Sequence, residues 1–151
     1  MRYLLILLFQ LFHFSPFRLQ ENRINIEHVP VKKVYKGYGS KTIKVLRGYG
    51  ISDIQIAIIL AEHGGELPSN NNVGNIRYTS GYPSYSSLEE GIAKQTSVLK
   101  KRYKNCFVKD PLQTIRNIQK RGYSPKKEWV TRVYAWYCAL QGDASKLQKL
   151  N

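Results

Sequence analysis

The chain has 151 residues, 42% of them hydrophobic, which favours one core and excludes a pair of full-sized domains. It carries 24 Lys and Arg against 10 Asp and Glu. The net charge of +14 indicates a polyanionic partner: nucleic acid, an anionic membrane surface or an anionic cell wall. The three histidines are scattered and Cys106 and Cys138 lack metal-ligand spacing, so we expect no metal and no cofactor. One disulfide between these cysteines is compatible with the sequence but not required by it.

The first twenty residues have the charge and length of an export signal. Arg2 precedes the apolar run YLLILLFQLF, which is too short to cross a bilayer comfortably. FSPFR, which follows, offers no small-residue cleavage pattern, so residues 1–20 are either a signal peptide, an N-terminal anchor or an amphipathic start to the fold. We expect the protein to be exported, and to be periplasmic, secreted or anchored to the membrane by this segment. Association with a phage is a further possibility that the sequence leaves open.

Residues 21–50 are predicted to form a basic extension before a main domain over residues 51–142. Six cations and no acid occur between residues 32 and 50, with two Gly-Tyr-Gly sequences around a short apolar segment. Tyrosines within a basic patch suit the stacking of bases or sugars. The favoured interpretation is a solvated turn-helix-turn that packs on the core through Ile43, Val45 and Leu46.

The most informative prediction is a buried helix that is capped by Ser52 and ends on Glu62, just before two glycines. Ser52 and Gln55 fit a capping box, and Gly64 suits the left-handed residue after a helix, so the apolar run IAIILA is helical rather than a strand. Glu62 follows this run at once. Desolvation and the negative end of the helix dipole both raise a carboxyl pKa, so we expect Glu62 to hold a proton near neutral pH and to donate it, as a glycosidase acid does. The alternative is a solvated acid on the last turn.

The segment from residue 68 to 85 is rich in Asn, Ser, Gly and Tyr. Amide groups and tyrosine rings suit the hydroxyl and N-acetyl groups of a sugar, so the segment fits a sugar cleft and an ordinary connection equally well.

Three further helices make the predicted fold all-α, with at most a minimal β hairpin. The first, over residues 87–103, begins with a second capping box at Ser87, and the next begins at Asp110-Pro111 and ends at Gly122. The last helix is predicted to begin at Ser124-Pro125, where a capping residue again precedes a proline. Their apolar stripes are, in chain order, Leu88, Ile92, Leu99 and Tyr103; Leu112, Ile115 and Ile118; and Trp129, Val133, Tyr137 and Leu140.

Four short blocks occur in an order that resembles a known family. They are AEHGG at 61–65, NVGNIR at 72–77, YPSYSS at 82–87 before a helix, and GYSP at 122–125 before WV at 129–130. Together they resemble the glucosaminidase family of peptidoglycan hydrolases, of the flagellar-muramidase and autolysin type. Each block is weak alone, but their collinear order covers about residues 50–140. The resemblance implies a lysozyme-like helical domain with a substrate groove, which cleaves β-1,4 bonds between N-acetylglucosamine and N-acetylmuramic acid.

The resemblance also implies roles for particular residues. Glu62 stands where the family has its catalytic acid. Tyr123 matches a groove tyrosine that places or stabilises the reacting sugar, and it is the second catalytic residue. Asn75 and Arg77 match the loop after the catalytic helix, and Tyr85 an aromatic before the next helix. These three are the expected substrate-binding residues, with peptidoglycan glycan strands on an anionic wall as the partner.

The sequence departs from the family where a second carboxylate is expected. No acid occurs between Glu66 and Glu89, and the family's acid after the Gly-Tyr pair is replaced by Lys126. Glu66 is best interpreted as a solvated turn acid. The substrate's N-acetyl group is then the expected internal nucleophile, giving either hydrolysis or the anhydro-sugar product of a lytic transglycosylase.

Two other classes stay open. A basic, helical nucleic-acid-binding module explains the charge, although the sequence has no recognisable DNA- or RNA-binding motif. A catalytically inactive cell-wall-binding or virion structural protein explains the missing second carboxylate.

Overall fold

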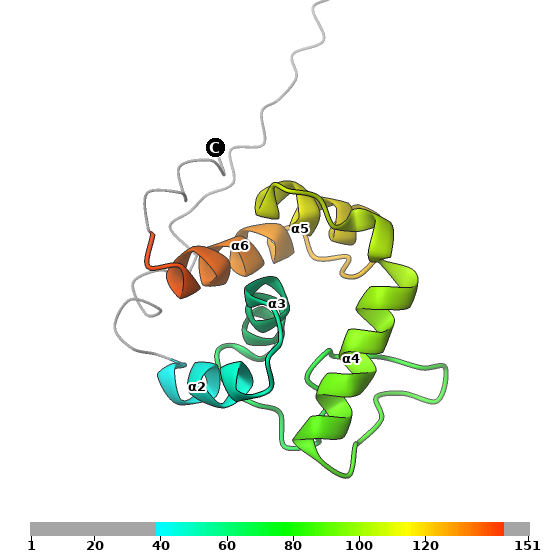
Figure 1. Ribbon diagram of the computed structural model, residues 1–151. Helices are drawn as coiled ribbons and strands as arrows, with labels where there is room; N and C mark the ends of the chain where they lie inside the picture. Colours follow the sequence, from blue (N-terminus) through cyan, green and yellow to red (C-terminus); the bar gives the residue numbers. More distant parts are fainter. Residues whose placement is uncertain (1–38, 144–151) are drawn as a thin grey trace, which may run out of the picture.

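A computed structural model describes residues 39–143 (Figure 1). Within this range the protein has five α-helices, one 3-10 helix and no strand, which confirms the predicted all-α class for this part of the chain. An isolated antiparallel bridge joins Tyr78 and Gly81. The predicted signal peptide or anchor, and the basic extension as far as residue 38, lie outside the described residues.

Helix α3 occupies the centre of the fold (Figure 1). It packs most extensively on α6, while α5 packs on α6 and α2 on α3. The long helix α4 stands to the right of this group, and the loop that precedes it runs past its lower half. The elements are α2 (Ser40–Gly48), α3 (Asp53–His63), α4 (Leu88–Arg102), η2 (Lys104–Cys106), α5 (Pro111–Lys120) and α6 (Trp129–Leu140).

The predicted buried helix is α3, and its sequence explains its place. Every residue from Ile56 to Ala61 is at most 1% exposed, so the helix is apolar on all sides and has to be surrounded by other elements. Ser52 accepts a hydrogen bond from the backbone N–H of Gln55, and Gly64 ends the helix with a positive φ of 65°. The Gln55 side chain does not complete the capping box.

Gln55 turns into the core instead. Its amide donates to Gln95 Oε1 at 3.1 Å and to Thr96 Oγ1 at 2.7 Å, both on α4. A buried amide needs partners, and α4 supplies them, so the Gln55 side chain does not bond to the backbone N–H of Ser52 as a capping box requires.

The other capped helices begin close to their predicted starts, with one exception. Ser87 caps α4, and Asp110 caps α5 by accepting from the Leu112 N–H at 2.9 Å. Helix α6 begins at Trp129, four residues later than its Ser124 signal predicts. Ser124 accepts from the Lys126 N–H in a turn, and the Lys126 carbonyl is taken by the Trp129 N–H. The prediction failed because this turn satisfies the groups that would have started the helix.

Two predicted faces also differ. On α2, Leu46 is buried and Ile43 is partly buried, but Val45 is 44% exposed because it lies on the opposite side of the helix from Ile43. On α6, Trp129 and Val133 of the predicted stripe are buried but Tyr137 and Leu140 only partly, whereas the helix, which packs on α3 and α5, buries eight of its twelve residues. Cys106 and Cys138 are buried thiols, not joined in a disulfide.

Candidate functional site

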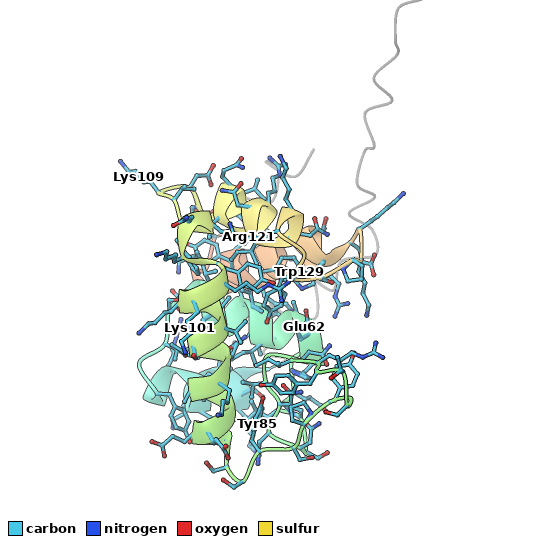
Figure 2. The ribbon with its side chains drawn as sticks, turned by 90° about the vertical axis from the view of Figure 1, so that its right-hand side faces the viewer. Glu62, Tyr85, Lys101, Lys109, Arg121 and Trp129 are labelled. Atoms are coloured by element: carbon cyan, nitrogen blue, oxygen red, sulfur yellow. The ribbon has the colours of Figure 1, made fainter. Side chains whose placement is uncertain are left out.

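Glu62 lies in the last turn of α3 and is half-buried, below Trp129 in Figure 2. Its Oε1 accepts from the Trp129 indole N–H at 2.6 Å, and its Oε2 accepts from the Asn75 amide at 3.0 Å. The indole N–H can only donate, so Oε1 acts as an acceptor whatever the charge of the carboxyl group. An Asn amide offers a donor on one side and an acceptor on the other. In this structure the donor side of the Asn75 amide faces Oε2.

The loop after α3 is built to hold Asn75 in this position. Buried Asn72 donates to the Ile76 carbonyl at 2.8 Å and accepts from the Ile76 N–H at 2.9 Å, which closes a turn around Asn75. Asn75 itself has a positive φ of 49°, which asparagine tolerates better than most residues. His63 joins the loop to α3 through a hydrogen bond of 3.0 Å between Nε2 and the Val73 carbonyl.

Tyr123 bonds to the same loop and lies beside Trp129. Its hydroxyl donates to the Gly74 carbonyl at 3.0 Å, and its ring lies 5.2 Å from the Trp129 ring. Burial raises the pKa of the Tyr123 hydroxyl well above its usual value, the neighbouring Gln95 side chain opposes this rise, and the nearby Glu62 charge adds to it. Tyr123 is thus a neutral phenol at ordinary pH, which suits it to hold the loop and to donate, not to act as a base.

Arg77 and Tyr85, the other predicted binding residues, contact other tyrosines of the loop rather than Glu62. Arg77 is exposed, with its guanidinium 5.7 Å from the centre of the Tyr82 ring. Tyr85 is half-buried beside Tyr78 and packs close to Gly91 of α4, apart from Glu62 in Figure 2. Burial and the neighbouring Tyr78 hydroxyl raise the pKa of Tyr85 to about 12.

Most amides of the Asn-rich loop are used within the loop itself. Asn70 Oδ1 accepts from the Asn72 N–H at 3.1 Å, and the Asn71 amide donates to the Tyr85 carbonyl at 3.0 Å. These groups shape the loop and leave Asn75 as the asparagine that meets Glu62.

The sequence did not indicate two residues that contact the end of α3. Trp129 was placed in an apolar stripe and in one of the four blocks but was given no role at the site, although a buried indole N–H usually finds a partner, and Glu62 is that partner here. Arg132, one turn further along α6, donates to the Ala61 carbonyl. It satisfies one of the backbone carbonyls that every helix leaves unpaired at its C-terminal end. No local pattern predicts that contact.

Comparison of the chain with protein-family models, with curated proteins and with solved structures found no match. In residues 39–143 no three His, Cys, Asp or Glu side chains gather where they could hold a metal ion. No helix of that range has the length and apolar character needed to cross a membrane. The described part of the protein is all-α, and the last turn of its central helix carries Glu62, whose carboxyl group accepts two hydrogen bonds.

Proposed function

We propose that this protein is a peptidoglycan hydrolase with a lysozyme-like domain, in which Glu62 is the general acid. The observation that carries the proposal is the placement of Glu62. It ends a buried helix, stays half-exposed, and is oriented by donors from two other segments, Trp129 of α6 and Asn75 of the loop. A fixed carboxyl group that can still reach a substrate is what general-acid catalysis requires.

The substrate class comes from the resemblance to the glucosaminidase family. Three of its four blocks are joined by hydrogen bonds in the fold, since Asn75 donates to Glu62 and Tyr123 donates to Gly74, the neighbour of Asn75. Glu62 and Tyr123, the outermost of these residues in the sequence, are 61 positions apart. The glycan strand of peptidoglycan, cut at the β-1,4 bond between N-acetylglucosamine and N-acetylmuramic acid, is the proposed substrate. The net charge of +14 favours accumulation on an anionic wall.

The proposed reaction begins with proton transfer from a Glu62 carboxyl oxygen to the glycosidic oxygen as the bond from that oxygen to C1 breaks. The N-acetyl carbonyl oxygen of the same sugar bonds to C1 and completes a five-membered ring. Glu62, now a carboxylate, then accepts the proton of the group that attacks C1. Attack by water gives a new reducing end, and attack by a hydroxyl of the same sugar gives an anhydro end. Both routes return the proton to Glu62.

The absence of an acid from the loop beside Glu62 favours this internal nucleophile. A pair of carboxylates that activates a water needs a separation of roughly 6.5–9.5 Å. The sequence places no acid in the loop between residues 67 and 88 that carries Asn75.

In the proposed complex, Tyr123 keeps the loop against the reacting sugar through its bond to Gly74. Asn75 orients Glu62, and Arg77 and Tyr85 bind sugars further along the strand. The exposed guanidinium of Arg77 and the tyrosine rings of this loop suit hydroxyl and N-acetyl groups.

The test compares the full-length wild type with Glu62→Gln and Glu66→Gln on purified peptidoglycan. Glu66 is the matched control, since it lies four positions on, on an exposed turn. We expect Glu62→Gln to lose about 100-fold or more of the activity and Glu66→Gln to keep it. Mass spectrometry of the released ends separates hydrolysis from transglycosylation. Full activity of Glu62→Gln removes the assignment of the acid, and wall binding by the wild type without release of sugars supports a binding protein instead.

A further inference from the structure

The exposed side chains of α4 and of the chain that follows it are strongly basic. Residues 91–109 contain six exposed cations and no acid: Lys94, Lys100, Lys101, Arg102, Lys104 and Lys109. In Figure 2, Lys101 and Lys109 project beyond one side of α4, while Glu62 and Trp129 lie on its other side. The proposed catalytic site makes no use of this surface.

The basic surface is hollowed. One hollow of about 490 Å³ is lined by Lys100, Lys104 and Phe107, and an adjoining one of about 610 Å³ by Lys100, Lys101 and Tyr49. We call these five residues the basic face. Both hollows share Ile51 and Thr96, and aliphatic side chains such as Leu99 and Ile92 contribute to their walls. Each hollow thus combines lysine side chains with a partly apolar wall.

Two aromatic side chains stand exposed on the basic face. Tyr49 is 43% and Phe107 is 42% exposed. The backbone on both sides of Phe107 is held, because the Cys106 carbonyl accepts from Asn117 and the Val108 N–H donates to Thr114 Oγ1. The exposure of Phe107 is therefore a fixed feature of the fold.

We propose that the basic face docks on the surface of a bilayer that contains anionic phospholipid. Lysine ammonium groups would meet the lipid phosphates, and Tyr49 and Phe107 would enter the interface, where aromatic rings beside lysines are favoured. The aliphatic walls of the hollows suit the glycerol and upper acyl region of a lipid. A nucleic acid would use the lysines and the rings but has no part that needs aliphatic walls.

The charges that line the two hollows are almost all positive, as binding to an anionic bilayer requires. Glu89 is the one acid that lines either hollow, and it lies eleven positions before Lys100, about 16 Å along the helix axis. Among the residues that line the two hollows, no carboxylate therefore lies next to Lys100, Lys101 or Lys104, where it would repel a lipid phosphate. Docking through this end leaves Glu62, on the other side of α4, uncovered.

Binding of the full-length chain to vesicles tests the proposal. The vesicles are phosphatidylcholine alone, or an equal mixture with phosphatidylglycerol, and the neutral vesicles measure any binding by residues 1–20. A Lys100→Gln/Lys101→Gln/Lys104→Gln triple variant should lose about 100-fold in affinity for the mixed vesicles, since each lysine near such a surface contributes about fivefold. The matched control replaces Lys120, Lys126 and Lys127, which are also exposed, and should lose much less.

The aromatic contribution is tested separately. Tyr49→Ser/Phe107→Ser should bind the mixed vesicles about tenfold more weakly at unchanged charge. If that double variant is poorly folded by circular dichroism, Phe107→Trp replaces it, and its fluorescence should be quenched by brominated lipid in the mixed vesicles.

Three results overturn the proposal. The first is equal loss in the two lysine triples, which means that total charge alone matters. The second is wild-type binding by the aromatic variant, or no quenching in Phe107→Trp. The third is loss of binding to a single-stranded oligonucleotide, with vesicle binding retained, in the Lys100/Lys101/Lys104 variant. Glu62→Gln should bind vesicles as the wild type does, so failure of the proposed hydrolase and failure of the docking surface give different results.

Discussion

Gly91, on the first turns of α4, offers the sharpest test of how the loop is held against that helix. A Cβ at this position would lie 1.8 Å from the Asn71 carbonyl oxygen. Contacts below about 3.0 Å essentially do not occur, and the obstacle here is backbone. Gly91→Ala therefore requires the loop or the helix to retreat by about 1.2 Å, the difference between these two distances.

The size of the effect follows from the bonds that such a retreat disturbs. The Asn71 carbonyl accepts from the Val73 N–H at 2.9 Å, the Asn71 amide donates to the Tyr85 carbonyl at 3.0 Å, and the Tyr85 N–H donates to Asn70. Each bond contributes about 1 kcal/mol net. Loss of all three, less the gain of about 1 kcal/mol from alanine in a helix, predicts a destabilisation of about 2 kcal/mol.

Urea unfolding followed by circular dichroism measures this difference, with Gly48→Ala as the matched control. Gly48 is also helical, and a Cβ there meets nothing within 4 Å, so its replacement should stabilise the protein by about 0.5–1 kcal/mol. The reasoning is refuted if Gly91→Ala is as stable as the wild type. It is also refuted if the two alanine variants change the free energy of unfolding in the same direction.

Three further predictions address the acid, a helix cap and the tyrosines. Trp129→Phe removes the N–H that donates to Glu62 and keeps an aromatic ring, so activity on peptidoglycan should fall about tenfold, and undiminished turnover would contradict the role of that bond. Asp110→Ala should cost about 1 kcal/mol in thermal unfolding because α5 loses its cap, and an unchanged midpoint would refute this. Burial, as the main cause, raises the pKa of Tyr85 and of Tyr134 to about 12. The unfolded value is about 10, so the folded state holds these protons more tightly; stability should be full below pH ~10 and fall as the pH rises towards 12. An unfolding free energy that stays constant over that range, or a Tyr134→Phe variant with the same slope as the wild type, would count against it.

Helix starts and ends were predictable where a single residue provides the signal. Ser52, Ser87 and Asp110 each accept a backbone N–H within three positions, and Gly64 adopts the left-handed conformation expected of it. Such contacts are local, so the spacing of residue types is enough to predict them. Ser124 has the same signal and failed, because Lys126 takes part in a turn that no helix pattern describes.

The position of Glu62 at the end of a buried helix was determined by the sequence itself, since an unbroken apolar run cannot remain in water and the residue after it must lie at the edge of the core. What orients its carboxyl group was decided by the tertiary structure alone. Trp129 is 67 positions away and Asn75 is 13, and both reach Glu62 only because α6 crosses α3 and the loop folds back on Asn72. Hydrophobic periodicity reports which face of a helix is buried, but not which distant donor that burial places beside a carboxyl oxygen.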